Sequence, residues 1–401
     1  MKPDRIVALI ALHRDTLLDD VLPFWLRHSP DSEFGGYLHH LDRDGRVVDD
    51  DKGIWCHGRF AWLLGRLCRT VEDRPEWRTA HQSGIDFLRA HAYGDDGHLL
   101  FQVTRDGQPL RRRRYLFSET FASIAFAEHA ALTSDEAAAQ EARRLYRSFV
   151  DGHEQPGQMA PKVDPVTRPM RSIGYPLGRI ATAQALGSAL GDDLDADIDS
   201  AIDEIATLFL SREHGALLEV VSPDGTPIDH VDGRTLNPGH AIEVAWFILA
   251  EAHRRGGKPE WVALGCEILD GMWQRGWDEE FGGLLYFVDL DGGPVQEYWH
   301  EMKFWWPHCE AALATLYAHA LTGEARYERM HRKVIDWSFE HFADPEMGEW
   351  FGYLRRDGSV ASTWKGNLWK GPFHLPRMLL VSWRLLEEMA TAGGDLSDQK
   401  Q

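Results

Sequence analysis

The chain has 401 residues, of which 43% are hydrophobic and 11% aromatic, enough apolar material for a large folded core and too much for a disordered protein. With 43 Lys and Arg against 63 Asp and Glu, its formal charge is −20, which repels nucleic-acid phosphates and anionic membrane surfaces. We therefore expect neither a nucleic acid nor a membrane as a partner.

The N-terminal segment predicts an amphipathic helix over residues 3–27. Only seven consecutive apolar residues (6–12) precede charged ones, and the segment has no small-residue cleavage site of the kind that ends a signal peptide. No other run approaches the ~20 apolar residues of a membrane span. The four cysteines form no Cys-x-x-Cys pair, which argues against a zinc site or a disulfide framework. We expect a cytoplasmic protein.

A turn phrase recurs along the chain: an apolar run that ends in Asp-Gly or a close relative of it. Five clear copies begin at Gly35, Gly97, Gly215, Gly282 and Gly348. Strand-type residues on both sides of a turn that tolerates positive φ predict a β-hairpin in each copy. The copies start 62 to 67 residues apart, except for one interval of 118 residues that holds a degenerate Asp-Pro copy from Gly157. The sequence therefore predicts six units.

Between consecutive hairpins there is room for two helices, and apolar residues recur there at intervals of three and four, as a helix with one buried face requires. Five such pairs, together with helices at residues 3–27 and 376–392, make twelve helices. Stacked helix pairs close into a ring when the two end helices meet. We predict an all-α fold, a single (α/α)6 barrel over residues 1–401 with short β-hairpins at its mouth and a disordered tail at 393–401. An open helical solenoid is the alternative, but it needs polar capping units that the sequence lacks.

The segment after each hairpin delivers the start of an inner helix to the mouth of such a ring, so these six segments are where functional residues are expected. They span residues 55–62, 115–122, 173–180, 237–246, 304–311 and 370–377. Polar and aromatic residues concentrate in them at positions where an inner helix would otherwise be apolar. These residues are Arg59, His240, Glu243, Trp305, Trp306, His308, Glu310, His374 and Arg377.

Two of these residues, His240 and His374, predict acid–base chemistry. A histidine with a pKa near ~6.5 can both take and return a proton at neutral pH. A pair of them on either side of a carbon acid is what a two-base epimerisation or isomerisation needs. Glu243 lies three residues after His240 on the same helical face, so we expect it to orient that imidazole. Arg59 and Arg377 are cations that would stabilise an enediolate oxygen.

The remaining signals are weaker. Trp306 stands at an inner-helix start and is a candidate for stacking on the apolar face of a sugar. His308 and Glu310 are two residues apart and cannot share a helical face, so only one of them is expected in the site. The basic run Arg111, Arg112, Arg113 and Arg114 beside a hairpin turn is typical of a solvated strand, with an anion site as the alternative.

Several stretches together resemble the N-acylglucosamine 2-epimerase family. They include NPGHAIEVAWFIL from Asn237, MKFWWPHCEA from Met302 and KGPFHLPR from Lys370, and the resemblance extends over about residues 30–380. It implies an (α/α)6 barrel, a homodimer, and interconversion of N-acetylglucosamine and N-acetylmannosamine at C2 of the open-chain sugar. It places the catalytic bases on His240 and His374, with substrate-binding roles for Arg59, Glu243, Trp306, Glu310 and Arg377. It implies no metal and no required cofactor. Some members respond to ATP, for which the sequence shows no site.

Three alternatives stay open at this point. The related cellobiose 2-epimerases and mannose or aldose-ketose isomerases carry a further histidine at the start of the third inner helix, where this chain has Tyr175, Pro176 and Leu177, and that difference favours the N-acyl branch. Glycoside hydrolases share the barrel and use two carboxylates, for which Glu243 and Glu310 are candidates. A non-enzymatic protein that binds partners through the outer face of the barrel is the third.

Overall fold

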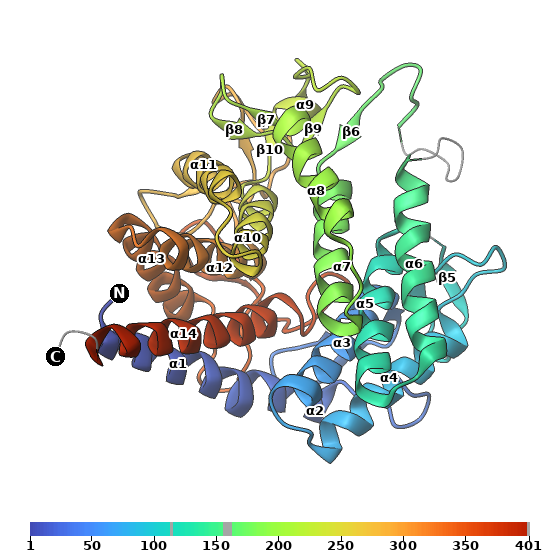
Figure 1. The fold of residues 1–401 in the computed structure, drawn as a ribbon. Helices are drawn as coiled ribbons and strands as arrows, with labels where there is room; N and C mark the ends of the chain where they lie inside the picture. The colour runs from blue at the N-terminus through green and yellow to red at the C-terminus, as the bar shows by residue number, and fades with distance from the viewer. Residues whose placement is uncertain (113–114, 155–162, 399–401) are drawn as a thin grey trace.

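The molecule is built from two concentric layers of helices (Figure 1). The structure, a computed structural model, describes residues 1–112, 115–154 and 163–398. In this part of the chain six inner helices surround the barrel axis. They are α3 (Ile54–Thr70), α5 (Phe117–Thr133), α7 (Gly174–Leu190), α10 (Pro238–Arg254), α12 (Trp305–Thr322) and α14 (His374–Asp398). Each of the six begins in the segment that the sequence predicts for an inner-helix start, or at its edge.

The outer layer consists of helices that pack against the inner ones. They are α4 (Pro75–His91), α6 (Glu136–Glu154), α8 (Asp195–Glu204) with its π-helical continuation η2 (Ile205–Phe209), α11 (Pro259–Gly276), α13 (Ala325–His341) and the N-terminal rod of α1 (Pro3–Asp15), η1 (Thr16–Val21) and α2 (Leu22–His28). The inner helices α10 and α12 are buried on nearly all sides, whereas α13 buries a single stripe. This difference is what an inner and an outer layer require.

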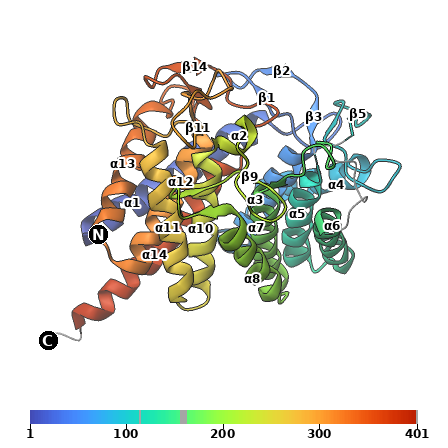
Figure 2. The ribbon, with the colours of Figure 1, turned by 90° about the horizontal axis from the view of Figure 1, so that it is seen from above.

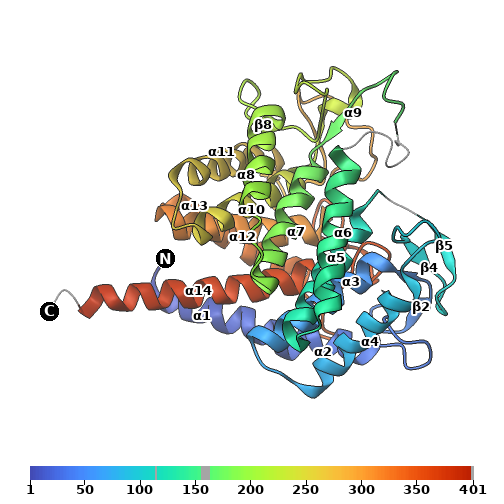
Figure 3. The same ribbon diagram turned by 45° about the vertical axis from the view of Figure 1, so that its right-hand side comes forward.

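The ring closes where the two ends of the chain meet. The N-terminal helix α1 lies alongside α14 in both side views (Figures 1 and 3). At the mouth, the Leu41 amide donates to the Gly366 carbonyl at 3.1 Å and the Gly366 amide donates back at 3.2 Å, which joins the first unit to the last. The predicted (α/α)6 barrel is therefore confirmed, and an open solenoid is excluded.

Short strands gather at one end of the helices and form the mouth of the barrel (Figure 2). They are β1 (His40–Leu41), β2 (Val47–Asp49), β3 (Lys52–Gly53), β4 (Gln102–Val103), β5 (Pro109–Arg111), β6 (Arg171–Ser172), β7 (Leu210–Ser211), β8 (Ala216–Leu217), β9 (Val220–Val221), β10 (Thr235–Leu236), β11 (Val288–Asp289), β12 (Lys303–Phe304), β13 (Tyr353–Leu354) and β14 (Val360–Ser362). A short helix, α9 (Val231–Arg234), also lies at this end.

Three of the predicted hairpins are confirmed, since β1 pairs with β2, β4 with β5 and β13 with β14. Their turn glycines have left-handed φ angles, for example 82° at Gly45 and 85° at Gly358. In the copies from Gly215 and Gly282 the prediction of a second strand is wrong. There, β9 and β11 pair instead with β6 and β10, the strands that precede inner helices α7 and α10. The copy from Gly157 lies partly outside the described residues.

The same cross-unit pairing recurs elsewhere in the ring: β3 pairs with β4 and β12 with β13. The strand that precedes an inner helix thus pairs with a strand of the next mouth segment along the chain. Neighbouring inner-helix starts are thereby held in register with one another, which matters because those starts carry the candidate site.

Buried ion triads reinforce three of the mouth turns. In each, a fully buried lysine from the segment that leads into an inner helix contacts a buried aspartate, which also binds an arginine. The triads are Lys52–Asp31–Arg105, Lys303–Asp278–Arg356 and Lys365–Asp344–Arg43. Buried charges are tolerated when they are paired and hydrogen-bonded in this way. Side-chain hydrogen bonds from Arg43 and Lys365 hold the pKa of Asp344 far below its usual range despite its burial.

The C-terminal helix is longer than the sequence predicts. The helix α14 runs to Asp398, beyond the predicted end at residue 392, so the part of the predicted tail from 393 to 398 is helical. Residues 399–401 lie outside the described part of the chain. Among the helices of the described residues, none is both long enough and apolar enough to cross a membrane.

Candidate active site

A cavity of about 1110 Å³ extends down the barrel axis from the mouth. All six inner helices contribute to its wall, together with mouth loops that supply Glu219, Tyr286 and Trp369. This volume is slightly larger than the ~300 to 1,000 Å³ of most small-molecule sites. Six of the seven predicted site residues line it: Arg59, His240, Glu243, Trp306, His374 and Arg377. The seventh, Glu310, is 0% exposed and lies directly behind His374 and Arg377.

His240 lies in the first turn of α10, where the Asn237 side chain caps the helix by accepting a hydrogen bond from the His240 amide at 3.2 Å. The imidazole Nδ1 lies 2.8 Å from Glu219 Oε1, and the ring is 38% exposed toward the cavity and the mouth. Burial by itself would lower the pKa of His240, but the negative charges of Glu219, Glu243 and Glu310 outweigh it. The net pKa is raised above its ordinary value.

The expectation that Glu243 orients His240 is wrong. Glu219, from the segment between β8 and β9, makes that contact, and Glu243 instead accepts a hydrogen bond from Arg377 at 2.8 Å. Helical spacing does put Glu243 on the cavity face. Its carboxylate is nevertheless drawn to the stronger partner, because a guanidinium offers a charge-assisted hydrogen bond.

His374 opens α14, and its Nδ1 lies 2.7 Å from Glu310 Oε1 and 3.4 Å from Arg377 Nη2. Its environment is the opposite of that of His240. Burial, followed by the positive charges of Arg377 and Arg59, lowers the pKa of His374 well below its ordinary value. The two imidazoles therefore favour different protonation states, which is the usual signature of an acid–base pair.

Both imidazoles border the same indole. The ring centroid of Trp306 lies 5.1 Å from that of His240 and 5.7 Å from that of His374. The predicted meeting of the two histidines in one cavity is thus confirmed by geometry. A carboxylate occupies Nδ1 of each ring, and no other residue of the described chain hydrogen-bonds either Nε2. Nε2 is therefore the nitrogen that each ring can offer to a ligand.

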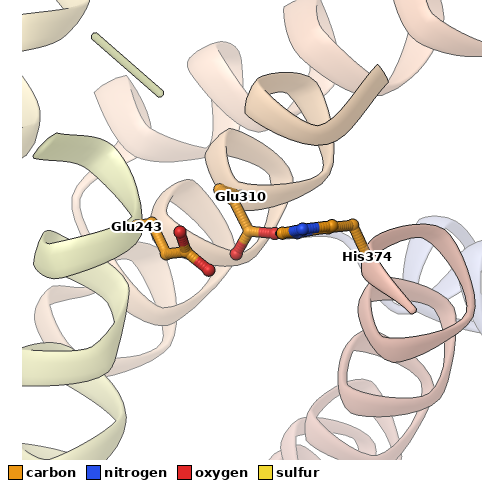
Figure 4. A group of neighbouring side chains, drawn as sticks. All are labelled: Glu243, Glu310 and His374. Atoms are coloured by element: carbon orange, nitrogen blue, oxygen red, sulfur yellow. The ribbon is translucent and has the colours of Figure 1, made fainter. Parts of the chain in front are cut away.

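Arg377 joins the two buried carboxylates of the site. Its Nη2 donates to Glu243 Oε1 at 2.8 Å and to Glu310 Oε1 at 2.7 Å, and Trp246 Nε1 donates to Glu310 Oε2. Glu243, Glu310 and His374 present oxygen and nitrogen atoms within 4.8 Å of one another, as a metal site would (Figure 4). The Arg377 guanidinium already supplies positive charge to both carboxylates. The expectation of no metal stays a prediction.

Arg59 lies one turn into α3 and has a different surrounding. Its guanidinium carbon lies 4.1 Å from the ring centroid of Phe121, 4.9 Å from that of Phe373 and 5.5 Å from that of Trp55. The hydrogen bond from Nη1 to the Trp369 carbonyl is long, at 3.4 Å. Burial lowers the pKa of Arg59 to about 10, and it remains a cation at neutral pH.

The structure also separates His308 from Glu310. His308 Nδ1 donates to the Phe304 carbonyl at 2.7 Å and its Nε2 accepts from the Leu284 amide at 2.9 Å, so the ring pins the mouth turn. Burial lowers the pKa of His308 to about 3. Only Glu310 of this pair contacts the cavity residues, as the spacing predicts. In the basic run, Arg111 is exposed in β5 and Arg112 lies 3.6 Å from Asp95, while Arg113 and Arg114 lie outside the described residues.

Sequence reasoning missed two residues that complete the site, Glu219 and Trp246. Trp246 lies three residues after Glu243 on α10, so the helical-face argument that places Glu243 in the cavity would have found it as well. No local pattern identifies Glu219, because its contact with His240 spans 21 residues and depends on how the β8–β9 segment folds over the mouth.

The chain was compared with known proteins. The family model described as N-acylglucosamine 2-epimerase (GlcNAc 2-epimerase) matches residues 36–178 and 190–373. The N-acylglucosamine 2-epimerase of Bos taurus is 38% identical over 385 residues, which cover 93% of this chain and 90% of the relative. The human N-acylglucosamine 2-epimerase is 36% identical over 389 residues, covering 92% and 88%. Among solved structures, the cellobiose 2-epimerase from Bacillus thermoamylovorans B4167 matches with a TM-score of 0.82 at 19% identity, covering 95% of this chain and 99% of that one.

The structural match supports the barrel fold alone, since its sequence identity is low. The family model matches more than half of the chain, and the two mammalian relatives extend over nearly all of it. On these grounds the chain belongs to the N-acylglucosamine 2-epimerase family.

Proposed function

We propose that this protein interconverts N-acetylglucosamine and N-acetylmannosamine by removing and returning the proton at C2 of the open-chain sugar. One observation carries the proposal: two imidazoles, each held at Nδ1 by a carboxylate, border the same indole in one cavity. The family membership and the identity to N-acylglucosamine 2-epimerases support the substrate.

The two histidines act in turn from opposite sides of C2. The carboxylates of Glu310 and Glu219 favour the tautomers that carry hydrogen on Nδ1, which leaves a lone pair on Nε2 of a neutral ring. Neutral His374 takes the C2 proton, the C2–H electron pair forms the C1–C2 double bond, and negative charge moves to the C1 oxygen. Protonated His240 then gives its Nε2 proton to the other face of C2. In the reverse direction the two rings exchange roles.

The remaining residues stabilise and position the intermediate. Arg59 has no carboxylate partner in the described chain, so we assign its free charge to the C1 oxygen of the enolate intermediate. Arg377 keeps Glu310 ionised and in place behind His374. Trp306, in contact with both imidazoles, offers an apolar face to the carbon chain of the sugar.

The glycoside hydrolase alternative is disfavoured by the state of its two candidate carboxylates. Glu243 and Glu310 share one nitrogen of Arg377, and Glu310 is 0% exposed. Hydrolysis needs the two carboxyl groups on either side of a glycosidic bond, at ~5 to 9.5 Å. A guanidinium between them leaves no place for that bond.

Epimerisation or isomerisation of unacylated sugars is the second candidate. The third inner-helix start favours the N-acyl substrate, because it lines the cavity with Gly174, Leu177 and Gly178, while the Tyr175 ring stacks on His153 with centroids 4.2 Å apart. This wall has small and apolar groups where the isomerase branches carry a histidine.

The experiment is proton NMR in heavy water, in which the protein is incubated separately with N-acetylglucosamine, N-acetylmannosamine, mannose, glucose, fructose and cellobiose. We expect loss of the C2 proton signal and appearance of the other epimer for the N-acetyl sugars. His240→Asn and His374→Asn should each abolish epimerisation, with His308→Asn as the control outside the cavity. Wild-type activity in either catalytic variant would refute the assignment, and cleavage of an oligosaccharide would favour a hydrolase.

We further propose that the protein is cytoplasmic, and that it is a homodimer that needs no cofactor, as the family resemblance implies. Light scattering after gel filtration tests the dimer by its mass. The same NMR assay run with and without ATP, after removal of metals by a chelator, tests the cofactor expectation. A rate that depends on added metal would contradict it.

A further inference from the structure

Arg59 is a buried cation without a matching anion. It is 9% exposed, and no carboxylate of the described residues lies within ion-pair distance of its guanidinium. Its neighbours are the aromatic rings of Trp55, Phe121 and Phe373 and the carbonyl of Trp369. An uncompensated buried charge is costly, and proteins retain one where a ligand supplies the opposite charge.

Arg377 provides the contrast inside the same cavity. It too is buried, but two carboxylates neutralise it. The other arginines that line the cavity are each paired with a carboxylate, so its remaining positive charges are Arg59 and the protonated form of His240. Glu219 accompanies His240 at 2.8 Å, whereas Arg59 has no such companion among the described residues.

Unpaired hydrogen-bond donors surround the same space. Five buried N–H groups of cavity-lining residues have no acceptor in the described structure: Trp55 Nε1, Arg59 Nε, Trp62 Nε1, Trp305 Nε1 and Arg377 Nε. A wall with unmatched donors and one unmatched cation is complementary to a ligand that is rich in acceptors and carries negative charge. A neutral aldose meets only the first of these two requirements.

We propose that the site binds stable sugar carboxylates, 2-acylamino-2-deoxyaldonates, with the C1 carboxylate on Arg59. The inference rests on the proposed function, because it places C1 of the ligand where the enolate oxygen forms. A carboxylate has a trigonal carbon and places negative charge on oxygen at C1, as does the enolate that forms when a 2-acylamino aldose loses its C2 proton. A guanidinium matches that geometry with two parallel hydrogen bonds.

A consequence is that the protein discriminates among open-chain ligands by the oxidation state of C1. The alditol with the same carbon chain and acylamino group keeps every hydroxyl contact but has no charge at C1. Hydrogen bonds to charged groups contribute enough that we expect the aldonate to bind about 10- to 100-fold more tightly than the alditol. Enzymes bind mimics of their transition states more tightly than substrates, and this preference follows the same rule.

Isothermal titration calorimetry on the full chain tests the proposal, with 2-acetamido-2-deoxygluconate and 2-acetamido-2-deoxyglucitol as probes. The preference for the aldonate should fall to within about 3-fold in Arg59→Met and persist in part in Arg59→Lys, which keeps the charge. Arg66→Met is the matched control, because Arg66 lines the far end of the cavity and already hydrogen-bonds Glu128 and Ser188. This control should retain the preference.

Each outcome bears on the proposal. Equal affinity of wild type for the two probes would overturn it, as would an aldonate preference that survives in Arg59→Met. Competition by acetate at the same concentration would indicate general anion binding and would also overturn it. Should Arg59→Met fail to fold, the wild-type comparison and Arg59→Lys still decide. Absence of C2 exchange with N-acetylglucosamine in wild type would instead reject the proposed function, which calorimetry does not measure.

Discussion

Replacing Glu219 with glutamine tests whether His240 is the protonated partner of the pair. The amide side chain of Glu219→Gln keeps the shape of the carboxylate and can still accept the Nδ1 hydrogen, so the tautomer of His240 is preserved. What is lost is the negative charge 2.8 Å from the ring. Glu219 stabilises the imidazolium, so its removal lowers the pKa of His240, and the acid form of the ring disappears at a lower pH than in wild type.

The size of the shift follows from the geometry. Two unit charges about 4 Å apart interact by about 1 kcal/mol in water and about 4 kcal/mol near a protein surface. Glu219 is 22% exposed, so solvent screening reduces the larger value and about 1 to 3 kcal/mol remains. At about 1.4 kcal/mol per pKa unit, the alkaline limb of the rate profile should move to lower pH by about one to two units.

The measurement is kcat/KM for C2 epimerisation between about pH 5 and 9, because this quantity reports the pKa values of the free enzyme. We expect Glu219→Gln to lose about 10- to 100-fold at the alkaline end and much less at the acid end. Glu297→Gln is the matched control, since Glu297 lines the same cavity without a contact to either imidazole among the described residues. An unchanged profile, or a limb displaced to higher pH, would refute the role of Glu219.

Two further substitutions separate site chemistry from stability. Arg377→Met leaves Glu243 and Glu310 buried without their shared counter-ion, so the free energy of unfolding should fall by about 3 to 5 kcal/mol in urea titrations, and a loss below about 1 kcal/mol would contradict the charge arrangement. His308→Ala removes both hydrogen bonds that pin the mouth turn and should lower stability by about 1 to 3 kcal/mol. Because its ring lies outside the cavity, C2 exchange per folded molecule should stay within about 3-fold of wild type. A selective loss of exchange without loss of stability would show a catalytic role.

The fold was predictable because it repeats. The Asp-Gly turns mark the units, and a helix with one apolar face has to pack against a neighbour, so six pairs imply a closed ring. The strand partners were not predictable from the same pattern. A two-residue strand such as β9 or β11 is too short to stabilise a hairpin on its own, and the pairing goes to the strand at the next helix entrance instead.

Site residues were predictable where their position on an inner helix brings them to the cavity. They were not predictable where a loop brings them there. His240, His374, Arg59, Glu310 and Arg377 all meet at the cavity or directly behind it because they occupy the first turns of inner helices. The partners of the imidazoles follow a different rule. Glu243, at helical spacing from His240, was expected to hold the imidazole, but its carboxylate pairs with the Arg377 guanidinium from another helix. The imidazole contacts Glu219 instead, which only the tertiary structure brings close.

Buried Lys–Asp–Arg triads precede three of the four inner helices that carry charged residues of the site; the fourth, α10, has none among the described residues. The three buried Lys–Asp–Arg triads stand at the entrances of α3, α12 and α14, and these are the helices that carry Arg59, Glu310 and the His374–Arg377 pair.

In α3 and α12 the correspondence extends to single positions. His57 accepts the Tyr37 amide as His308 accepts that of Leu284, and two residues later each helix presents its charged group, Arg59 in one and Glu310 in the other. The histidine that hydrogen-bonds the mouth turn therefore also fixes how far along the barrel axis the charged side chain lies. The repeat sets the position of this side chain in the barrel, and the residue type at that position decides whether the unit contributes a cation or a carboxylate to the site.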